Sequence, residues 1–332
     1  MPSARPDPFA PDLLRPTRDL RRFGESVHDL DASGRPKWTV VRRGIVVASD
    51  TWNGLTPEQR QAGLVHATSL QMTGTKPQPF SHTSAGAVWG LPRVSAWPRR
   101  IDVSVFGRSA HSSGLVRRHC LDADDALDPD DPDAFEIVDG LLVTPLVRTI
   151  VDLARTEDPR DAVAAADHAL HHDLCTTADL TTELARVPAG ARGRAKAAFV
   201  VRFAEPGAMS VGESLSRVQM YRLGLPRPQL QVPVADADGV IGIGDFWWER
   251  ERVVGEFDGR KKYKVTEDMT PEEAGQTLWN EKRREDRIRA THRRMARWGW
   301  DDAMSPMRLV ARLADQGVQR PARLRDTWFD AA

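Results

Sequence analysis

Two short apolar segments that also contain acids hold the residues best suited to chemistry in this chain. Residues 244–248 (Gly-Asp-Phe-Trp-Trp) and 253–259 (Val-Val-Gly-Glu-Phe-Asp-Gly) are separated by four charged residues. Two such segments around a short polar link predict a β-hairpin with the link as its tip. In this hairpin Trp248 faces Val253.

The same register brings carboxylates together. Asp245 lies opposite Glu256, and the two-residue period of a strand places Asp258 on their face of the hairpin. Like charges directly opposite each other destabilise a sheet, and hard divalent cations prefer oxygen ligands. We therefore predict that Asp245, Glu256 and Asp258 bind a metal ion, Mg²⁺ or Mn²⁺.

Basic residues follow the acids directly. Acids that hold Mg²⁺ position it to polarise a phosphate and acidify a water, and a nearby lysine orients that water and offsets developing charge. Lys262 is predicted to take this catalytic role, and Lys261 to contact nucleic acid. Glu213, on a helix predicted over residues 212–221, is expected to support the same centre. The alternative is a hairpin whose acids are merely solvated.

A run of basic residues predicts a contact with nucleic acid. Residues 280–298 are predicted to form one long helix, and the part from Glu281 to Arg297 holds eight basic and three acidic residues. This excess of base favours phosphate contact, and the alternative is a solvated helix with i,i+4 ion pairs. The residues predicted to hold phosphates are Arg217, Arg283, Arg284 and Arg287.

The C-terminal part resembles the PD-(D/E)XK nuclease superfamily, and within it the very-short-patch-repair-endonuclease-like domains. The resemblance covers about residues 205–320. It implies a restriction-endonuclease-like mixed sheet flanked by helices. It also implies that Asp245 and Glu256 are metal ligands. Four blocks carry it, in order: Glu213 with Ser216-Arg217, then 244–248, 255–263 and 280–286.

The chain departs from this superfamily at its lysine. Asp258 stands where the (D/E)-x-K element has the lysine, so Lys262 would supply the amine from four residues later. The first expectation is therefore a Mg²⁺-dependent endonuclease that hydrolyses DNA. The alternative is an antitoxin-like or regulatory DNA-binding protein whose nuclease fold is inactive.

Residues 36–180 resemble the abortive-infection type IV antitoxin family (AbiEi-like). The resemblance implies an N-terminal winged helix that binds DNA, and a toxin or other defence-system partner. Residues 19–30 give at most one helix, so the winged helix is degraded, but a wing-like hairpin with Arg42 and Arg43 is expected to contact nucleic acid. The matching blocks are 41–47, 81–85, 116–119 and 143–154.

One histidine of these blocks lies between hydroxyl groups. His82 follows Ser81 and precedes Ser84 by two residues. No Gly-x-Ser-x-Gly elbow accompanies them, which argues against a hydrolase. We predict that His82 caps a helix and packs as a buried imidazole.

The order of predicted helices and strands, together with the two resemblances, implies an α/β (α+β) protein. The length of 332 residues suggests two or three domains, and the resemblances imply an AbiEi-like region over 1–185, a linker helix over 186–205 and a nuclease-like domain over 206–320. Net charge is zero, so nucleic acid must be bound by a local patch. Two cysteines without a CxxC pair, no signal peptide and no long apolar run predict a cytoplasmic protein that contacts no membrane.

Overall fold

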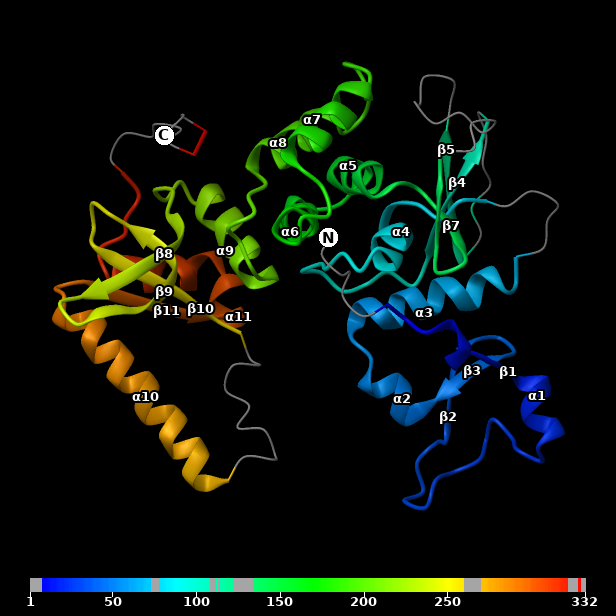
Figure 1. Ribbon diagram of the computed structural model, residues 1–332. Helices are drawn as coiled ribbons and strands as arrows, with labels where there is room; N and C mark the ends of the chain where they lie inside the picture. Colours follow the sequence, from blue (N-terminus) through cyan, green and yellow to red (C-terminus); the bar gives the residue numbers. More distant parts are fainter. Residues whose placement is uncertain are drawn as a thin grey trace. The chain divides into compact units, whose positions relative to one another are not determined.

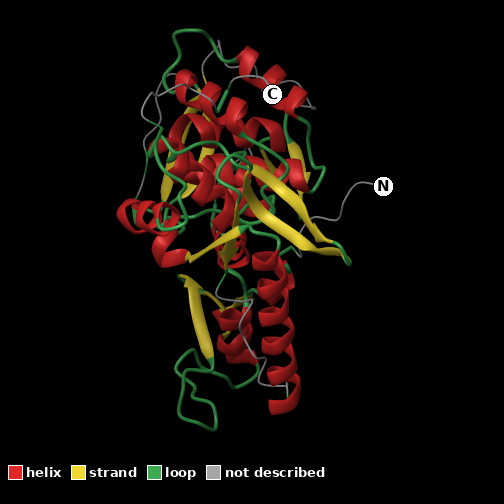
Figure 2. Cartoon of the chain, turned by 90° about the vertical axis from the view of Figure 1, so that its left-hand side faces the viewer, coloured by secondary structure: helices red, strands yellow, loops and turns green. Residues whose placement is uncertain are grey.

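The chain folds into two units, each with its own core. They are Met1–Ala204, called the first unit, and Glu205–Ala332, called the second unit. The computed structural model describes residues 8–72, 78–107, 112, 114–121, 134–259, 270–321 and 328–329, without the side chains of 271, 272, 274, 277, 278, 280 and 281. Strands form separate small sheets among helices (Figure 2), which confirms the α+β class.

The second unit is built around a mixed sheet in which the strands lie in the order β11-β10-β9-β8. Strand β10 pairs antiparallel with β9 and parallel with β11. In Figure 1 the C-terminal part of α10 lies against this sheet, and the rest of the helix extends away from it. The elements are α9 (Val211–Arg222), β8 (Gln229–Asp236), β9 (Gly239–Trp248), β10 (Val253–Asp258), α10 (Pro271–Ala290), β11 (Arg294–Gly299), α11 (Trp300–Ala303) and α12 (Pro306–Ala314).

Each face of this sheet packs against a different helix. On one face the indole Nε1 of Trp298 donates a hydrogen bond of 2.9 Å to Ser216 Oγ of α9. On the other face Val254 and Met295 pack with Ile288 of α10. Because side chains alternate along a strand, the acids of β10 share the α10 face with Val254.

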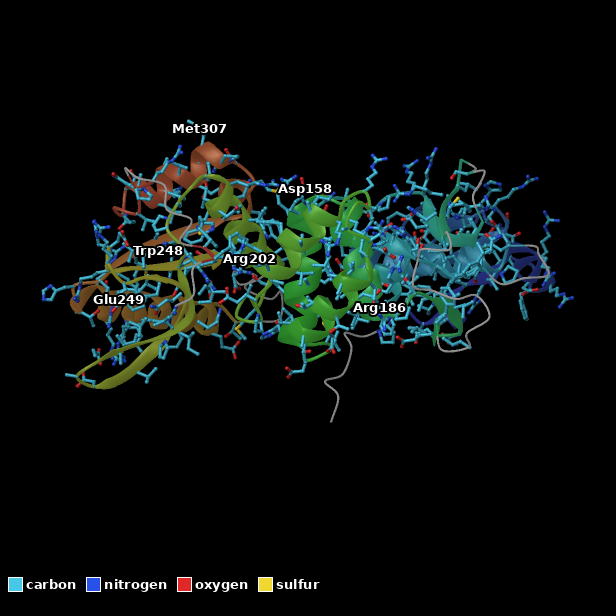
Figure 3. The ribbon with its side chains drawn as sticks, turned by 90° about the horizontal axis from the view of Figure 1, so that it is seen from above. Asp158, Arg186, Arg202, Trp248, Glu249 and Met307 are labelled. Atoms are coloured by element: carbon cyan, nitrogen blue, oxygen red, sulfur yellow. The ribbon has the colours of Figure 1, made fainter. Side chains whose placement is uncertain are left out.

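The predicted hairpin is confirmed, including its register. Trp248 pairs with Val253, and the ladder continues to Phe246 opposite Gly255. Phe246 and Trp248 are buried as expected, while Glu249 begins the exposed tip (Figure 3). A hairpin is a local structure, so its register follows from the apolar pattern and the length of the link.

The predicted single helix over residues 280–298 is wrong. Helix α10 ends at Ala290, and His292 adopts a left-handed φ of 61°. The chain then enters β11, which runs parallel to β10 with Arg297 opposite Glu256. Met295 and Trp298 are buried on opposite faces of the sheet, and this burial stabilises a strand where the charge pattern predicted a helix.

The first unit contains several small sheets covered by helices. Strands β1, β3 and β2 form one sheet, and β4 pairs in parallel with β5. Its elements are η1 (Pro11–Leu13), β1 (Arg15–Pro16), α1 (Thr17–Arg22), β2 (Trp38–Arg42), β3 (Ile45–Ala48), α2 (Ser49–Gly54), α3 (Pro57–Ser69), α4 (His82–Val88), β4 (Ile101–Phe106), β5 (Val116–Leu121), β6 (Glu136–Val138), β7 (Leu141–Val143), α5 (Leu146–Thr156), α6 (Pro159–His171), α7 (Thr177–Arg186) and α8 (Arg194–Phe203).

The predicted linker, residues 186–205, is part of the first unit's core. It contains α8, which contacts α5, α6 and α7. Ala197, Val200 and Phe203 are buried in these contacts. A helix with a buried apolar face belongs to a packed layer, so the boundary between the units lies after Ala204.

None of the described helices combines the length and apolarity needed to cross a membrane.

Candidate active site

Asp245 and Glu256 are neighbours on the paired strands β9 and β10. One oxygen of Asp245, Oδ2, accepts a hydrogen bond of 2.8 Å from the backbone N–H of Phe257. Burial raises the pKa of the Glu256 carboxyl above its ordinary value, and the charge of Asp245 adds to this increase. Two acids this close favour a cation between or beside them.

Two arginines already supply positive charge to Glu256. Arg284 Nη2 of α10 lies 2.6 Å from Glu256 Oε1, and Arg297 Nη2 of β11 lies 2.9 Å from Glu256 Oε2. These guanidinium groups oppose the effect of burial on the Glu256 pKa. Gly242 of β9 makes room for the approach, since a Cβ there would lie 2.7 Å from Arg284 Nε.

The chemistry of the acid pair suits a divalent cation, but no described three-ligand group includes the third predicted ligand, Asp258. Asp258 is half-buried at the end of β10. Within the described residues, no group of three His, Cys, Asp or Glu side chains is arranged to hold a metal. The oxygens of Glu256 face arginines instead, so metal binding would require Arg284 or Arg297 to move.

Lys261 and Lys262, predicted for nucleic-acid contact and catalysis, lie outside the described residues.

Glu213 has a structural partner set at the start of α9. Its carboxylate accepts hydrogen bonds from the backbone N–H of Met209 at 3.0 Å and from Ser210 Oγ at 2.7 Å. Ser210 Oγ in turn accepts from the Glu213 N–H, so Ser210 is the N-cap of α9. Gln231 Nε2 donates to the same carboxylate at 3.2 Å. These bonds hold Glu213 in the first turn of the helix, and its support of the acid pair stays a prediction.

Arg217 was predicted to hold phosphate, and the structure corrects this. The residue is 2% exposed, and its Nη2 lies 2.9 Å from Glu205 Oε2. Arg227 shares that carboxylate at 3.2 Å. A buried guanidinium with a carboxylate partner is part of the core and is closed to a phosphate.

The other predicted phosphate ligands of α10 are in different situations. Arg287 makes two hydrogen bonds to Asp236, of 2.9 and 2.7 Å. Arg283 is exposed and lies over the ring of Trp279, 4.7 Å from its centroid. Of the two, Arg283 is therefore the more accessible to a phosphate.

The two arginines of the predicted hairpin in the first unit, Arg42 and Arg43, differ in exposure. Arg42 of β2 points its guanidinium inward, with Nε 2.9 Å from Thr68 Oγ1. Arg43 follows β2 at the exposed turn before β3. Arg43 therefore fits the predicted nucleic-acid contact better than Arg42.

Arg297 was missed as a partner of Glu256. Arg297 was placed in the helix predicted over residues 280–298, and a residue of a helix is not expected to pair with a residue of β10. The alternation of Met295 and Arg297 on one face with Ala296 and Trp298 on the other is typical of a strand, and it was the available signal.

Comparison with known proteins gives little functional information. No protein family model matches the chain. Over 121 residues it is 33% identical to uncharacterized protein Rv2248 of Mycobacterium tuberculosis strain H37Rv and to uncharacterized protein MT2308 of strain CDC 1551. This region is 36% of the chain, which spans only 44% of each relative. Neither name states an activity.

Proposed function

We propose that the second unit is a Mg²⁺- or Mn²⁺-dependent endonuclease that hydrolyses DNA. One observation carries the proposal: Asp245 and Glu256 are adjacent acids on paired strands, with Arg284 and Arg297 beside them. Phosphodiester hydrolysis uses this combination of acids and cations. The resemblance of residues 205–320 to PD-(D/E)XK nucleases points to the same activity.

Each side chain would have a separate role. Asp245 and Glu256 would hold the metal ion, which supplies a polarised phosphate and a more acidic water when bound. Arg284 and Arg297, once released from Glu256, would pair with the phosphate and offset its developing charge. Lys262 stays the predicted residue for orienting the attacking water.

A second function is favoured by the ion pairs themselves. Both oxygens of Glu256 already face a guanidinium, so the site is balanced in charge without a metal. This state suits a DNA-binding or antitoxin-like protein that uses a nuclease-like fold without cleavage. A toxin or other defence-system partner, and a cytoplasmic location, remain predictions from resemblance and composition.

Loss of either acid is expected to abolish cleavage. Asp245→Asn and Glu256→Gln keep the size of each side chain and remove its charge. Mutating even an outer partner of a metal ligand costs 10–100-fold, so loss of a ligand should reduce nicking by at least about 100-fold. Conversion of supercoiled plasmid to open circles, with Mg²⁺ or Mn²⁺ and with EDTA, measures the rate. Glu249→Gln, at the exposed tip of the same hairpin, is the matched control.

Each outcome separates the two functions. Nicking that needs the metal and both acids supports the endonuclease. Nicking that survives both substitutions contradicts the assignment of the site. DNA binding without any metal-dependent nicking supports the second function.

Removal of the Arg284 guanidinium is expected to strengthen metal binding. Arg284→Gln leaves Glu256 with Arg297 as its one described cationic partner, so a divalent cation meets less competition. One pKa unit of interaction corresponds to about tenfold in affinity, and we expect a gain of about this size for Mn²⁺. Calorimetric titration with Mn²⁺ measures it, with Arg283→Gln as the exposed neighbouring control. An unchanged or weaker Mn²⁺ affinity in Arg284→Gln would argue against a metal at Glu256.

A further inference from the structure

A large cavity with basic walls lies within the first unit. It has a volume of about 850 Å³ and is lined by residues of α4, β5 and α5 and by the segment 189–196 that leads into α8. Among the described lining residues, Asp152 is the one acid. The basic side chains of the wall are Arg117, Arg148, Arg155, Arg192, Arg194 and Lys196.

Three of these cations have no carboxylate partner in the described part of the chain. Arg194 Nε donates to the carbonyl of Val187 at 2.9 Å, and Lys196 Nζ donates to the carbonyl of Glu157 at 2.7 Å. The Arg192 side chain has no described partner. A carbonyl is neutral, so these hydrogen bonds leave the three positive charges uncompensated.

The backbone holds these cations against α5. Gly193 has a φ of 81°, and a Cβ there would lie 2.4 Å from the carbonyl oxygen of Arg155. Only glycine allows this approach. Arg155 Nε also donates to the carbonyl of Arg192 at 3.3 Å. The segment 189–196 therefore holds Arg192, Arg194 and Lys196 close to one another despite their repulsion, and a bound anion would reduce this repulsion.

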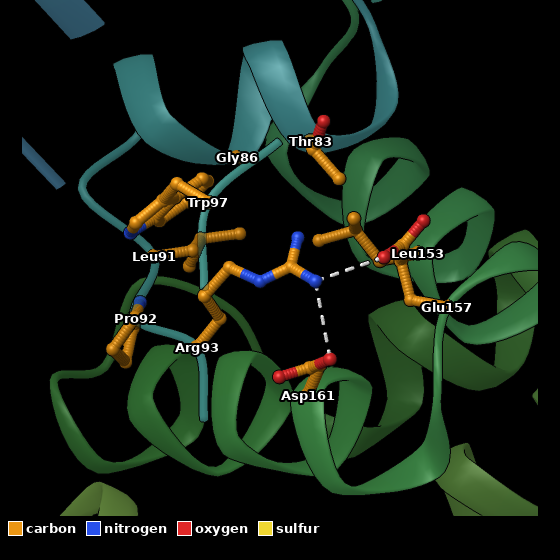
Figure 4. A pocket seen from close by; sticks show the side chains of 9 residues that line it. All are labelled: Thr83, Gly86, Leu91, Pro92, Arg93, Trp97, Leu153, Glu157 and Asp161. Atoms are coloured by element: carbon orange, nitrogen blue, oxygen red, sulfur yellow. Dashed lines mark hydrogen bonds and ion pairs between the residues drawn. The ribbon is translucent and has the colours of Figure 1, made fainter. Parts of the chain in front are cut away.

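The acids near the cavity are already neutralised. Asp152 lies 2.9 Å from Arg148 Nε and 3.5 Å from Arg155 Nη1. Glu157 turns its carboxylate toward Arg93, whose Nη2 lies 3.1 Å from it (Figure 4). That contact belongs to a separate, much smaller pocket, and the other oxygen of Glu157 lies 3.9 Å from Arg117 Nη2 of the wall. The wall of the large cavity therefore keeps a positive excess.

A third acid, Asp102, is buried beneath two of the lining residues. Asp102 is 0% exposed and accepts hydrogen bonds from Arg117 Nη2 at 3.1 Å and His119 Nε2 at 2.9 Å. The ring of His119 stacks on His82 with centroids 3.6 Å apart and an angle of 13° between the planes. Both histidines are among the residues that line the cavity, so aromatic side chains lie beside the cations.

We infer that this cavity binds a nucleoside polyphosphate, with its phosphates on Arg192, Arg194 and Lys196 and its base near the histidine stack. Pockets for small molecules measure about 300–1,000 Å³, so the volume suits one nucleotide. Arginine and lysine are the side chains that bind phosphate, and bases stack on aromatic rings. This site lies in the first unit and does not depend on the proposed cleavage activity of the second.

The test is a titration of the full chain with ATP, GTP, inorganic tripolyphosphate and a single-stranded oligonucleotide. We expect ATP or GTP to bind more tightly than tripolyphosphate. Hydrogen bonds to a charged group are among the strong ones, so Arg192→Gln and Lys196→Gln should each weaken binding about tenfold or more. Arg202→Gln, an exposed residue of the same helix α8 (Figure 3), should have no effect.

Cys120 provides a second measurement on the unaltered chain. It is exposed and lines the cavity, whereas Cys175 is buried. ATP should slow the alkylation of Cys120 and leave Cys175 unchanged. The inference is overturned if none of the nucleotides binds, if the Arg192 and Lys196 variants bind as well as the original chain, if tripolyphosphate binds as tightly as ATP, or if only the oligonucleotide protects Cys120.

Discussion

Replacing Gly212 with alanine is expected to destabilise the second unit by roughly 2 kcal/mol. A Cβ on Gly212 would lie 1.9 Å from Cε1 of Phe257. The Phe257 ring has little room to move, because the residue is 4% exposed and packs edge-on to Trp300 at 5.5 Å. A contact of 1.9 Å calls for the upper end of the overpacking cost, roughly 3 kcal/mol, from which the better helix propensity of alanine takes about 1 kcal/mol.

Denaturant midpoints and hydrogen exchange in α9 and β10 measure this loss. Gly275→Ala in α10 is the matched control, because no heavy atom lies within 4 Å of a Cβ there, and it should gain roughly 0.5–1 kcal/mol. Adding Phe257→Leu to Gly212→Ala should recover part of the stability, since the added methyl then meets a smaller side chain. A midpoint unchanged in Gly212→Ala would contradict the described contact of α9 with β10.

Acidification from pH about 7.5 to about 4.5 is expected to cost the first unit roughly 2–3 kcal/mol through His82 alone. The pKa of His82 is lowered from 6.5 to about 4, chiefly by burial; His119 and Arg117 also lower it, while Asp152 and Asp102 raise it. The unfolded chain therefore takes up the proton first. The contribution of neutral His82 to the stability of the first unit is fully present above about pH 6.5 and is lost as the pH decreases toward 4.

Urea unfolding across this pH range, followed by hydrogen exchange in peptides of the first unit, measures the slope of its stability against pH. His82→Asn should be less stable at neutral pH but lose less on acidification. Asparagine tolerates the left-handed φ of 48° at this position. His28→Asn, an exposed histidine of the same unit, should keep the original slope. Burial also lowers the pKa of His168 to about 4, so His82→Asn/His168→Asn should be flatter still.

Structures formed by neighbours in the sequence were predictable. The 248/253 register of the hairpin was correct because the link between the strands is short. The start of α3 at Pro57 is equally local, because a capping box between Thr56 and Gln59 fixes it. In both cases the turn or cap residues and the apolar pattern act over a few residues.

The error at β11 came from a contact that the local pattern does not contain. Residues 291–293 include neither glycine nor proline, so nothing in the sequence marked the end of α10. Only the parallel partner β10, about 40 residues earlier, makes Arg294–Gly299 a strand. Charge alone suggested a continuous basic helix. Tertiary pairing outweighed local propensity here.

The candidate site was predicted by residue type more successfully than by geometry. Asp245 and Glu256 were expected to face each other, and they do lie close together. Their partners were not foreseen, because Arg284 and Arg297 come from two later elements. The buried imidazole of His82 was predicted correctly, but the predicted helix cap was wrong, because His82 is the first residue of α4 and no side chain caps this helix. The stack of His82 on His119 joins α4 to β5. Such contacts between distant segments leave no periodic pattern in a sequence.

The last strand of the second unit's sheet is also the last to be synthesised. A nascent chain that ends within α10 can pair β8, β9 and β10, but the free edge of β10 lacks β11. Unpaired strand edges promote aggregation of incomplete chains. Glu256 and Asp258 lie on that edge, and charge on an edge strand discourages pairing with another molecule. Arg297 then arrives with β11 and pairs with Glu256, so the charge on the open edge of β10 is balanced once the sheet is complete.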